Sequence, residues 1–412
     1  MRILFLTQVL PYPLTSGARI RAYYMLRYLA QQHQITLVSF IRDDDAPQHI
    51  DHLKTFCHQV HTVLITRSPI KDVTSLAHSL ISRTPLVMIR DRIPAMFDQL
   101  RTLIAANPFD IIHADQTSMS EYGLFARDQH PPSATPKTIL DQHNAMHLLV
   151  KRQAQYENGL LRSWVWQRES RLFINYERQL CTAYDHILTV TDEDKHALLK
   201  LFPPAERPSQ QHKFTSIPIC VDPDTVPPLD WQPKPNQIIH LGTMFWPPNI
   251  EGVLWFAQEV LPLIINKIPN AYFIIAGKNP PDSIKNLAAP DSPLHGHVEV
   301  TGFVLDPEPL LAQSQLFIVP ILAGGGMRVK IVDGWQWGLP IVSTSLGAEG
   351  VSTQHGETIL IADDAPAFAQ AAIQIMQNQD LAEQLRLNGR QWVETAYNWQ
   401  RIYPQLNTLY QL

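Results

Sequence analysis

The chain has 412 residues, of which 45% are hydrophobic and 17% are charged, so it can form two or three globular domains with ordinary cores. Its formal net charge of −5 at pH 7 produces no overall basic field, which argues against a nucleic-acid-binding protein. Any anion-binding site must therefore be local.

The N-terminal run MRILFLTQVLPYP is apolar, but it is too short to span a membrane and lacks the small-residue cleavage site of a signal peptide. We interpret it as a first β-strand. No later stretch reaches the roughly 18 apolar residues that a spanning helix needs. The cysteines, Cys57, Cys181 and Cys220, are scattered and odd in number, as is typical of reduced thiols. We expect a cytoplasmic protein, either soluble or in peripheral contact with the inner face of the membrane.

Apolar, β-rich runs alternate with helical patterns through the first half of the chain. These runs are Arg2–Thr7, Ile35–Phe40, Val60–Ile65, Ile111–Asp115, Thr138–His143 and His186–Thr191. Continuous apolar strands separated by helices are typical of a parallel sheet that is covered on both faces. No G-x-G-x-x-G sequence follows the first strand, so a nicotinamide dinucleotide site is not indicated.

A single glycine, Gly17, stands between PYPLTS and the helical pattern ARIRAYYMLRYLA. It either ends a loop or lets the backbone come close to a ligand. Arg19 and Arg21 open the helix that follows, where they could bind an acceptor anion or be solvated at the surface.

Polar side chains end two later strands of the first half. His113 and Asp115 lie in FDIIHADQ, and His143 lies in ILDQHNAM. The first two could face a ligand at the strand ends, or they could form a hydrogen-bonded pair that orients a loop. A lone histidine is more often structural than functional, so the case for His143 depends on its position at a strand end.

Several metal-ligand residue types crowd into one short segment, and they are His49, His52, Cys57, His58 and His61. Their spacing matches no standard zinc pattern, and Cys57 fits the buried end of a helix. We therefore predict no metal site.

The segment 151–178 mixes arginines with Trp164, Trp166 and Phe173. An amphipathic face of this kind could rest on a membrane or hold a lipid-linked acceptor. The alternative, which the interspersed acidic residues favour, is an ordinary helix with its aromatic side chains in the core.

A proline-dense segment, 223–236, follows the first half and is typical of a linker. Further apolar runs then repeat the alternation, and they are Ile238–Thr243, Ala271–Gly277, Val298–Phe303, Leu316–Ile321, Pro340–Ser345 and Thr358–Ala362. We therefore predict two doubly wound parallel-sheet domains, 1–222 and 237–390. Such domains bind ligands at the carboxyl ends of their strands, here in a cleft between the two.

The segment 316–347, LFIVPILAGGGMRVKIVDGWQWGLPIVSTSLG, is the most informative part of the chain. It predicts a strand, a glycine loop, a helix and a second strand. Gly324, Gly325 and Gly326 permit close approach of the backbone to a ligand. The free N–H groups and the positive dipole end of the helix point toward the same loop.

Charged side chains follow these glycines directly. Arg328 and Lys330 could neutralise a diphosphate in the loop, the first with a planar fork and the second with a point charge. Asp333 lies further along the helix, where its carboxylate could accept hydrogen bonds from ribose hydroxyls.

This segment resembles the donor site of GT-B glycosyltransferases, in particular the retaining group called family 4. Bacterial polysaccharide-type (group 1) members that read Gly-Gly-Gly-Thr-Arg-Leu-Lys are the most similar. The family usually carries two acids eight residues apart. In this chain the second position holds Asp333, a shorter acid, and the first holds Gly325.

The resemblance extends over nearly the whole chain and implies the GT-B fold, an α/β fold of two Rossmann-like domains that face a cleft. It also implies that a C-terminal helix, here 391–412, crosses back to the N-terminal, acceptor-side domain. Many members carry an arginine and a lysine after the first strand of the second domain, where this chain has Met244, Phe245 and Trp246.

The resemblance implies site residues in three groups. The catalytic residues are His143, Arg328 and Lys330. The donor-binding residues are Gly17, Gly242, Thr243, Phe303, Val304, Gly324, Gly325, Gly326, Met327, Asp333 and Glu349. The acceptor-side candidates are Arg19, Arg21, His113 and Asp115. Phe303 and Val304 could instead simply end a strand, and Glu349 could be a charge at a helix N-terminus.

The implied function is retaining, metal-independent hexosyl transfer from a nucleotide-diphosphate sugar, such as a UDP-sugar, to a hydroxyl group. The acceptor would be a glycan, a lipid-linked molecule or a small molecule, as in polysaccharide biosynthesis. The sugar nucleotide is a co-substrate, and no further cofactor is implied. The alternatives are a sugar-nucleotide epimerase of the same fold and a non-catalytic glycan- or nucleotide-binding relative.

Overall fold

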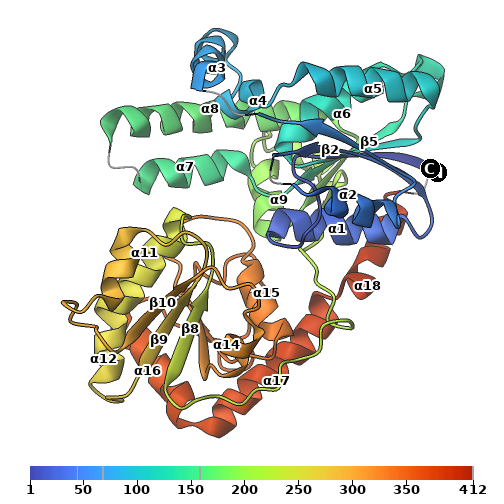
Figure 1. Cartoon of the computed structure of the whole chain (residues 1–412). Coiled ribbons are helices and arrows are strands. Elements are labelled where there is room, and N and C mark those ends of the chain that lie inside the picture. Colours follow the sequence, from blue (N-terminus) through green and yellow to red (C-terminus); the bar gives the residue numbers. More distant parts are fainter. Residues whose placement is uncertain (44, 67–68, 157–158, 411–412) are drawn as a thin grey trace. The chain divides into compact units, whose positions relative to one another are not determined.

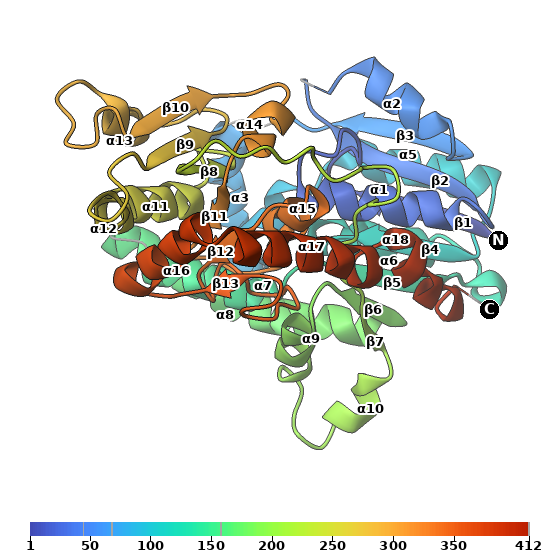
Figure 2. The ribbon, with the colours of Figure 1, turned by 90° about the horizontal axis from the view of Figure 1, so that it is seen from below.

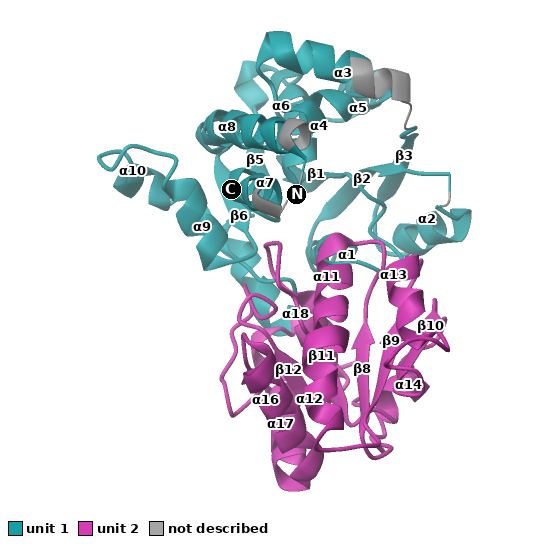
Figure 3. Cartoon of the chain, turned by 90° about the vertical axis from the view of Figure 1, so that its left-hand side faces the viewer, with its two compact units in different colours: residues 1–220, 399–412 teal, residues 221–398 magenta. Residues whose placement is uncertain are grey.

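The computed structural model describes residues 1–43, 45–66, 69–156 and 159–410. These residues divide into two compact units, which Figure 3 distinguishes by colour. Unit 1 comprises Met1–Cys220 and Trp399–Leu412, and unit 2 comprises Val221–Asn398. The proline-dense segment 223–236 therefore falls within unit 2.

Unit 1 is built on a seven-stranded sheet with the strand order β3-β2-β1-β4-β5-β6-β7. The strands are β1 (Arg2–Thr7), β2 (Gln34–Ile41), β3 (Gln59–Leu64), β4 (Ile111–Asp115), β5 (Lys137–Gln142), β6 (His186–Thr189) and β7 (Phe214–Ser216). Neighbouring strands pair in parallel, so that Ile3 of β1 lies opposite Ile35 of β2 and Ile111 of β4. All three side chains are fully buried, because helices cover both faces of a parallel sheet.

The helices of unit 1 lie on the two faces of this sheet. They are α1 (Gly17–Leu29), α2 (Pro47–Lys54), α3 (Pro69–Ser82), α4 (Leu86–Arg90), α5 (Pro94–Ala106), η1 (Thr117–Met119), α6 (Ser120–Asp128), η2 (Pro132–Ala134), α7 (Met146–Tyr156), α8 (Leu160–Ala183), α9 (Asp192–Leu199), α10 (Arg207–Gln211), α18 (Trp399–Ile402) and η5 (Tyr403–Thr408). Figure 1 shows α1 and α2 on one face and α5 and α6 on the other.

The C-terminal segment 399–410 belongs to unit 1 and contacts α1. Trp399 stacks on Tyr24 of α1 with ring centroids 5.7 Å apart. The Tyr28 hydroxyl, also on α1, donates a hydrogen bond to Asn407 Oδ1 at 2.9 Å. These contacts join the chain terminus to the helix that follows β1.

Unit 2 is built on a six-stranded parallel sheet with the strand order β10-β9-β8-β11-β12-β13. The strands are β8 (Gln237–Leu241), β9 (Tyr272–Ala276), β10 (Val298–Gly302), β11 (Leu316–Val319), β12 (Ile341–Ser343) and β13 (Leu360–Ile361). The helices are α11 (Pro247–Trp255), η3 (Phe256–Val260), α12 (Leu261–Ile265), α13 (Asp282–Lys285), η4 (Asn286–Ala288), α14 (Glu308–Ala312), α15 (Val329–Gln336), α16 (Ala365–Gln377) and α17 (Gln379–Ala396).

The helices of unit 2 also form two layers. Figure 1 shows α11, α12 and α16 on one face of the sheet and α14 and α15 on the other. Phe256 and Phe368 meet edge to face in the first layer, with ring centroids 5.7 Å apart. Figure 2 shows α17 running beside α15, where Gly389 leaves room for the buried Trp335 ring.

Each sheet has one topological switch point, where the chain continues on the other side of the first strand. In unit 1 this point lies between β1 and β4, and in unit 2 it lies between β8 and β11. Loops that leave the carboxyl ends of such strand pairs diverge, so open parallel sheets bind ligands at this position. The two switch points are therefore the places to look for functional side chains.

Two doubly wound parallel sheets confirm the predicted fold class, and all the predicted apolar runs contain or overlap a strand. β7 was not predicted, because Phe214–Ser216 is only three residues long and mostly polar. The predicted strand Thr358–Ala362 is shorter in the structure, where β13 has two residues.

The segment 151–178 forms parts of α7 and α8, apart from positions outside the described residues. Phe173 is buried in unit 1, whereas the Trp164 side chain is 56% exposed. The aromatic side chains are thus divided between core and surface, and contact of this segment with a membrane stays a prediction. Within the described parts of the chain, none of the helices has the length and apolar character needed to cross a membrane.

Candidate functional site

The glycine loop of unit 2 connects β11 to α15, as the sequence predicts. Gly324 has φ 111° and Gly326 has φ 82°, a backbone region that glycine adopts without strain. A Cβ atom at Gly324 would lie 3.0 Å from a terminal nitrogen of Arg328. The absence of a side chain here therefore lets the guanidinium lie against the loop.

Arg328 is the residue from which α15 starts. Its Nε and a terminal nitrogen are each 3.5 Å from a main-chain carbonyl oxygen, of Leu346 and Ala323 respectively. Leu346 follows β12 and Ala323 follows β11, so the guanidinium lies at the carboxyl ends of both strands. Contacts of this length are weak, and a charged ligand could replace them.

Lys330 reaches the switch point of unit 2. Its Nζ is 2.9 Å from Asn249 Oδ1 and 3.3 Å from His240 Nε2. Burial lowers the pKa of Lys330 to about 7, with a further contribution from the positive charge of Arg328 and an opposing one from Asp333. Two cationic side chains are thus brought together where α15 begins, which is an electrostatic environment suited to an anion.

Asp333 lies on α15, three positions after Lys330. Burial raises its pKa to about 7, although the positive charge of Lys330 opposes this change. Ionised, this carboxylate accepts hydrogen bonds only, which suits a ligand with hydroxyl groups.

The other predicted donor-binding residues lie at several strand ends of unit 2. Gly242 and Thr243 follow β8, and Thr243 accepts a main-chain hydrogen bond from Asn249 Nδ2 at 2.8 Å. Phe303 and Val304 follow β10, which lies two strands, or about 10 Å, from β8. The Phe303 ring is 67% exposed.

Three predicted donor-binding residues of unit 2 remain. Gly325 and Met327 lie in the glycine loop, and Glu349 lies in the turns after β12. All three are partly buried. The structure thus brings Gly242, the glycine loop, Arg328, Lys330 and Asp333 to the carboxyl-terminal side of the central strands β8 and β11. Phe303 lies on the same side of the sheet, but at the edge strand β10.

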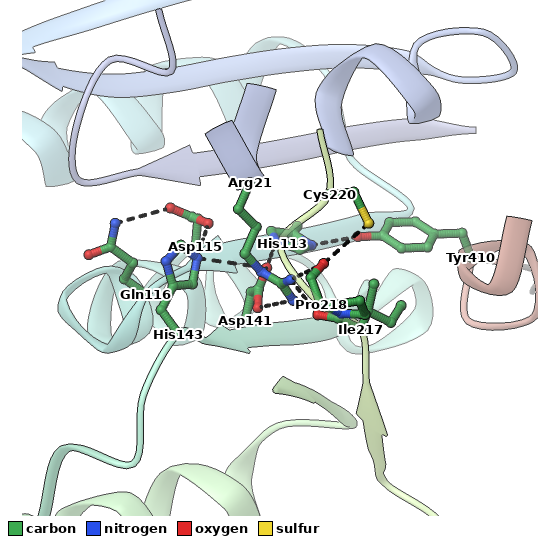
Figure 4. A network of polar contacts seen from close by, with 10 residues as sticks. All are labelled: Arg21, His113, Asp115, Gln116, Asp141, His143, Ile217, Pro218, Cys220 and Tyr410. Carbon is green, nitrogen blue, oxygen red and sulfur yellow. Dashed lines mark hydrogen bonds and ion pairs between the residues drawn. The ribbon is translucent and has the colours of Figure 1, made fainter. Parts of the chain in front are cut away.

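A buried polar network occupies the strand ends of unit 1 (Figure 4). Arg21 of α1 contacts both carboxylate oxygens of Asp141 of β5, each at 2.8 Å, and it also donates to the main-chain oxygen of Ile217. Both charged side chains are completely buried. Burial alone would raise the pKa of Asp141, but Arg21 outweighs this effect and the pKa is lowered.

Two histidines extend this network in opposite directions. His113 of β4 forms a hydrogen bond with the Tyr410 hydroxyl, and burial lowers its pKa to about 3. His143, just after β5, lies with its Nε2 2.8 Å from Asp115 Oδ1. The His143 side chain keeps 10% of its surface exposed whereas His113 is fully buried, so His143 is the one of these two histidines that a ligand could reach.

Two acceptor-side predictions in unit 1 are wrong. Arg21 and His113 have no exposed surface, so neither can contact an acceptor. Arg21 instead neutralises Asp141, and His113 stacks on Phe5 with ring centroids 4.0 Å apart. Their burial results from the return of the C-terminal residues and from the close packing of α1 on the sheet.

The other predicted site residues of unit 1 lie in different environments. Arg19 is partly exposed and forms an ion pair with Asp45 at 3.2 Å. Asp115 is fully buried, and it contacts the partly exposed His143. Gly17 is the first residue of α1.

The ligand atoms of His113, Asp115 and Asp141 lie within 4.8 Å of one another, a spacing that could suit a metal ion. The charge of Asp141 is already neutralised by Arg21, whose guanidinium would repel a divalent cation. These residues therefore do not fit a metal site. In the His49–His61 segment, His52 forms a hydrogen bond with the Tyr23 hydroxyl at 2.9 Å.

Sequence reasoning missed Asp141, Tyr410, His240 and Asn249. Asp141 stands two positions before His143 and directly follows the apolar Ile139 and Leu140, a position that indicates a buried charge with a partner. The other three give no local signal, since the site residues that they contact are 81 or more positions away in the sequence.

Two family models match the chain. One, described as Glycosyltransferase Family 4, matches residues 15–225. The other, described as Glycosyl transferases group 1, matches residues 235–378. Among known proteins, the chain is similar to an uncharacterized 44.6 kDa protein in the cps region of Klebsiella pneumoniae, with 21% identity over 416 residues that cover 98% of each chain.

Solved structures share the fold over the full length. HepE of Anabaena, solved in complex with UDP, matches with a TM-score of 0.64 and 15% identity over 100% of both chains. Sucrose-phosphate synthase from Thermosynechococcus elongatus matches with a TM-score of 0.69 and 16% identity over 100% of this chain and 98% of that one. At this level of identity the likeness concerns the fold.

We expect Arg21→Met to lower the free energy of unfolding by about 3–5 kcal/mol, because it leaves Asp141 buried without a counter-ion. Arg21 keeps the pKa of Asp141 below its unfolded value, so the pair stabilises the folded protein above pH 4 or so. Without Arg21, burial raises the pKa of Asp141, and the stability of the variant should fall from pH 5 to pH 8.

Urea unfolding at both pH values measures this effect. The matched control is Arg19→Met in the same helix, which removes a partly exposed ion pair and should cost less than about 1 kcal/mol. Equal losses in the two variants would contradict the assignment of Arg21 to a buried structural pair.

Proposed function

We propose a donor, an acceptor class and a mechanism for this chain on the premise that it belongs to glycosyltransferase family 4, whose family model matches residues 15–225. The chain is a glycosyltransferase that depends on a nucleotide sugar. Its acceptor, the stereochemistry of transfer and the role of each site residue are what we propose below.

One observation carries the donor site: two cations meet at the switch point of unit 2, beside a glycine loop and the start of α15. Lys330 Nζ lies next to Asn249, and Arg328 lies against Gly324. We place the donor diphosphate here, with the N–H groups of α15 as additional donors. Asp333 would accept hydrogen bonds from the ribose hydroxyls, and the backbone at Phe303 and Val304 would meet the base.

We propose UDP as the nucleotide of the donor. HepE, which shares the fold, has been solved with UDP bound. The acceptor that we propose is a hydroxyl of a glycan or of a lipid-linked or small-molecule acceptor. The similar Klebsiella protein, which is encoded in a cps region, supports a role in polysaccharide biosynthesis.

Transfer with retention would proceed as follows. The bond between the anomeric carbon and the phosphate oxygen breaks, and an acceptor hydroxyl attacks from the same face. The acceptor proton passes to the departing phosphate oxygen, so that no protein base is needed. Negative charge builds up on the diphosphate as it leaves, and Arg328, Lys330 and the start of α15 stabilise that charge.

In unit 1 we propose His143 as the residue that contacts a substrate. Asp115 accepts a hydrogen bond from its Nε2 and would fix the orientation of the ring. Gly17, Arg19 and Glu349 stay predictions as further substrate contacts.

Arg328→Ala should abolish turnover and weaken binding of a nucleoside diphosphate by about 2–3 kcal/mol, because a charge-assisted contact is lost. The measurement is sugar release or transfer with a panel of nucleotide-diphosphate sugars, together with calorimetric titration of UDP. The control is Lys285→Ala, which removes an exposed cation of the same unit. Activity of the Arg328 variant at the level of the unchanged protein would refute the donor site.

Transfer should not require a divalent ion, since we assign the neutralisation of the diphosphate to Arg328 and Lys330. The test is activity before and after chelator treatment and dialysis. Loss of activity that manganese or magnesium restores would show that these two side chains do not suffice.

Asp333→Asn should weaken donor binding by roughly 1–2 kcal/mol and leave the fold intact, because a neutral acceptor replaces a charged one. Asp333→Glu should retain binding, since it restores the acid length common in the family. Calorimetric titration with UDP distinguishes the two variants. If the asparagine variant binds as tightly as the unchanged protein, Asp333 makes no ribose contact.

A further inference from the structure

The ammonium of Lys330 lies against a histidine whose protonation pattern the main chain determines. His240 Nδ1 is 3.0 Å from the carbonyl oxygen of Ile318, which can only accept a hydrogen bond. Nδ1 therefore carries the ring hydrogen, and the lone pair of Nε2 points to Lys330 Nζ at 3.3 Å. Burial lowers the pKa of His240 well below its usual value, so the ring stays neutral.

Asn249 is oriented in the same manner. Its Nδ2 donates to the main-chain oxygen of Thr243 at 2.8 Å, which directs Oδ1 to Lys330 Nζ at 2.9 Å. The Asn249 side chain is buried and has one orientation that satisfies both contacts. Lys330 thus donates to two acceptors, neither of which carries a charge.

Gly242 provides the space for this arrangement. A Cβ atom at this position would lie 2.1 Å from Lys330 Nζ and 3.1 Å from Asn249 Nδ2. Both distances are shorter than van der Waals contact, so a larger residue would displace the ammonium. The position of the Lys330 ammonium therefore requires glycine at residue 242.

We propose that His240, Asn249 and Gly242 are positioning residues, a neutral seat that holds Lys330 at the switch point with its charge available to the donor diphosphate. This inference rests on the proposed donor site and adds the residues that make it work. An ammonium has three hydrogens, and the seat engages two of them with fixed acceptors. An acid at either position would hold the lysine more tightly but would cancel its charge.

The seat has a consequence for proton binding. The charged or titratable groups that face Lys330 from the elements packed against it are Arg328 and Asp333 of α15 and His240 of β8. Burial and Arg328 lower the pKa of Lys330 to about 7, so at pH 8 most of the free protein carries a neutral lysine. A bound diphosphate favours the charged form, so binding takes up a proton and affinity falls as pH rises above 7.

The experiment is calorimetric titration with UDP at pH 8 in buffers of different ionisation enthalpy, which counts the protons taken up. At this pH the terminal phosphate of UDP is already ionised, since such groups have a pKa of about 6. The unchanged protein should take up close to one proton. Lys330→Met should take up none, and Asp333→Asn should still take it up, which assigns the proton to the lysine.

Asn249→Asp is the decisive variant. Its carboxylate should keep Lys330 protonated in the free protein, so proton uptake should vanish and UDP affinity should fall about tenfold or more. The matched control is Asn270→Asp, which makes the same charge change in an exposed turn just before β9, at the amino-terminal ends of the strands. It should leave uptake and affinity unchanged.

Gly242→Ala provides a second test if Asn249→Asp does not fold. Its added methyl group meets the flexible end of Lys330, so the fold should survive while the ammonium moves to solvent. UDP affinity should fall about tenfold, as when a charge-assisted contact is lost, and proton uptake should decrease. Thermal unfolding of each variant checks that it is folded.

The outcomes separate the two proposals. If the unchanged protein binds neither UDP nor ADP or GDP, the proposed donor site fails and the seat fails with it. If it binds UDP, but Asn249→Asp and Gly242→Ala bind with the same affinity and proton uptake, the seat is overturned and the donor site stands.

Discussion

The ammonium of Lys330 has to be held at the carboxyl ends of β8 and β11 by hydrogen-bond acceptors that do not themselves cancel its charge. Other features of unit 2 follow from this requirement. Asn249 and His240 contact the ammonium as neutral acceptors, and Gly242 leaves it room. Arg328 adds a second positive charge two positions earlier, and this repulsion contributes to the lowered pKa of Lys330. A site of this kind stores unfavourable electrostatic energy that an anionic ligand relieves.

In unit 1, by contrast, the buried cation has a charged partner. Arg21 and Asp141 neutralise each other in the interior, where neither meets solvent. The pair joins α1 to β5, and it also ties the strand ends to the main chain at Ile217. Both side chains are removed from solvent and satisfy each other, so the pair connects two secondary-structure elements and offers no free charge to a ligand. The network reaches a partly exposed histidine at His143, whose orientation Asp115 sets.

The fold could be predicted largely because its signals are local. Apolar runs such as Ile111–Asp115 and Leu316–Val319 are strands buried on both faces, and their alternation with helices leaves few alternatives to parallel sheets. β7 was not predicted because Phe214–Ser216 has too few apolar residues to form a recognisable pattern. It is a strand because it pairs with the neighbouring β6. The glycine loop before Arg328 was equally readable, since positive φ values at Gly324 and Gly326 need a residue type that the sequence displays.

The sequence by itself determined the two-sheet architecture, the glycine loop and the cations that follow it, because each depends on residues within about one strand–loop–helix unit. Only the tertiary structure decided which charges are free to act. Arg21 and Lys330 both stand in helical patterns near a strand end, yet Arg21 meets Asp141, 120 positions away, and Lys330 meets Asn249, 81 positions away. One partner is charged and the other is neutral. That difference arises from which distant residues the strand order brings together, and no local pattern encodes it.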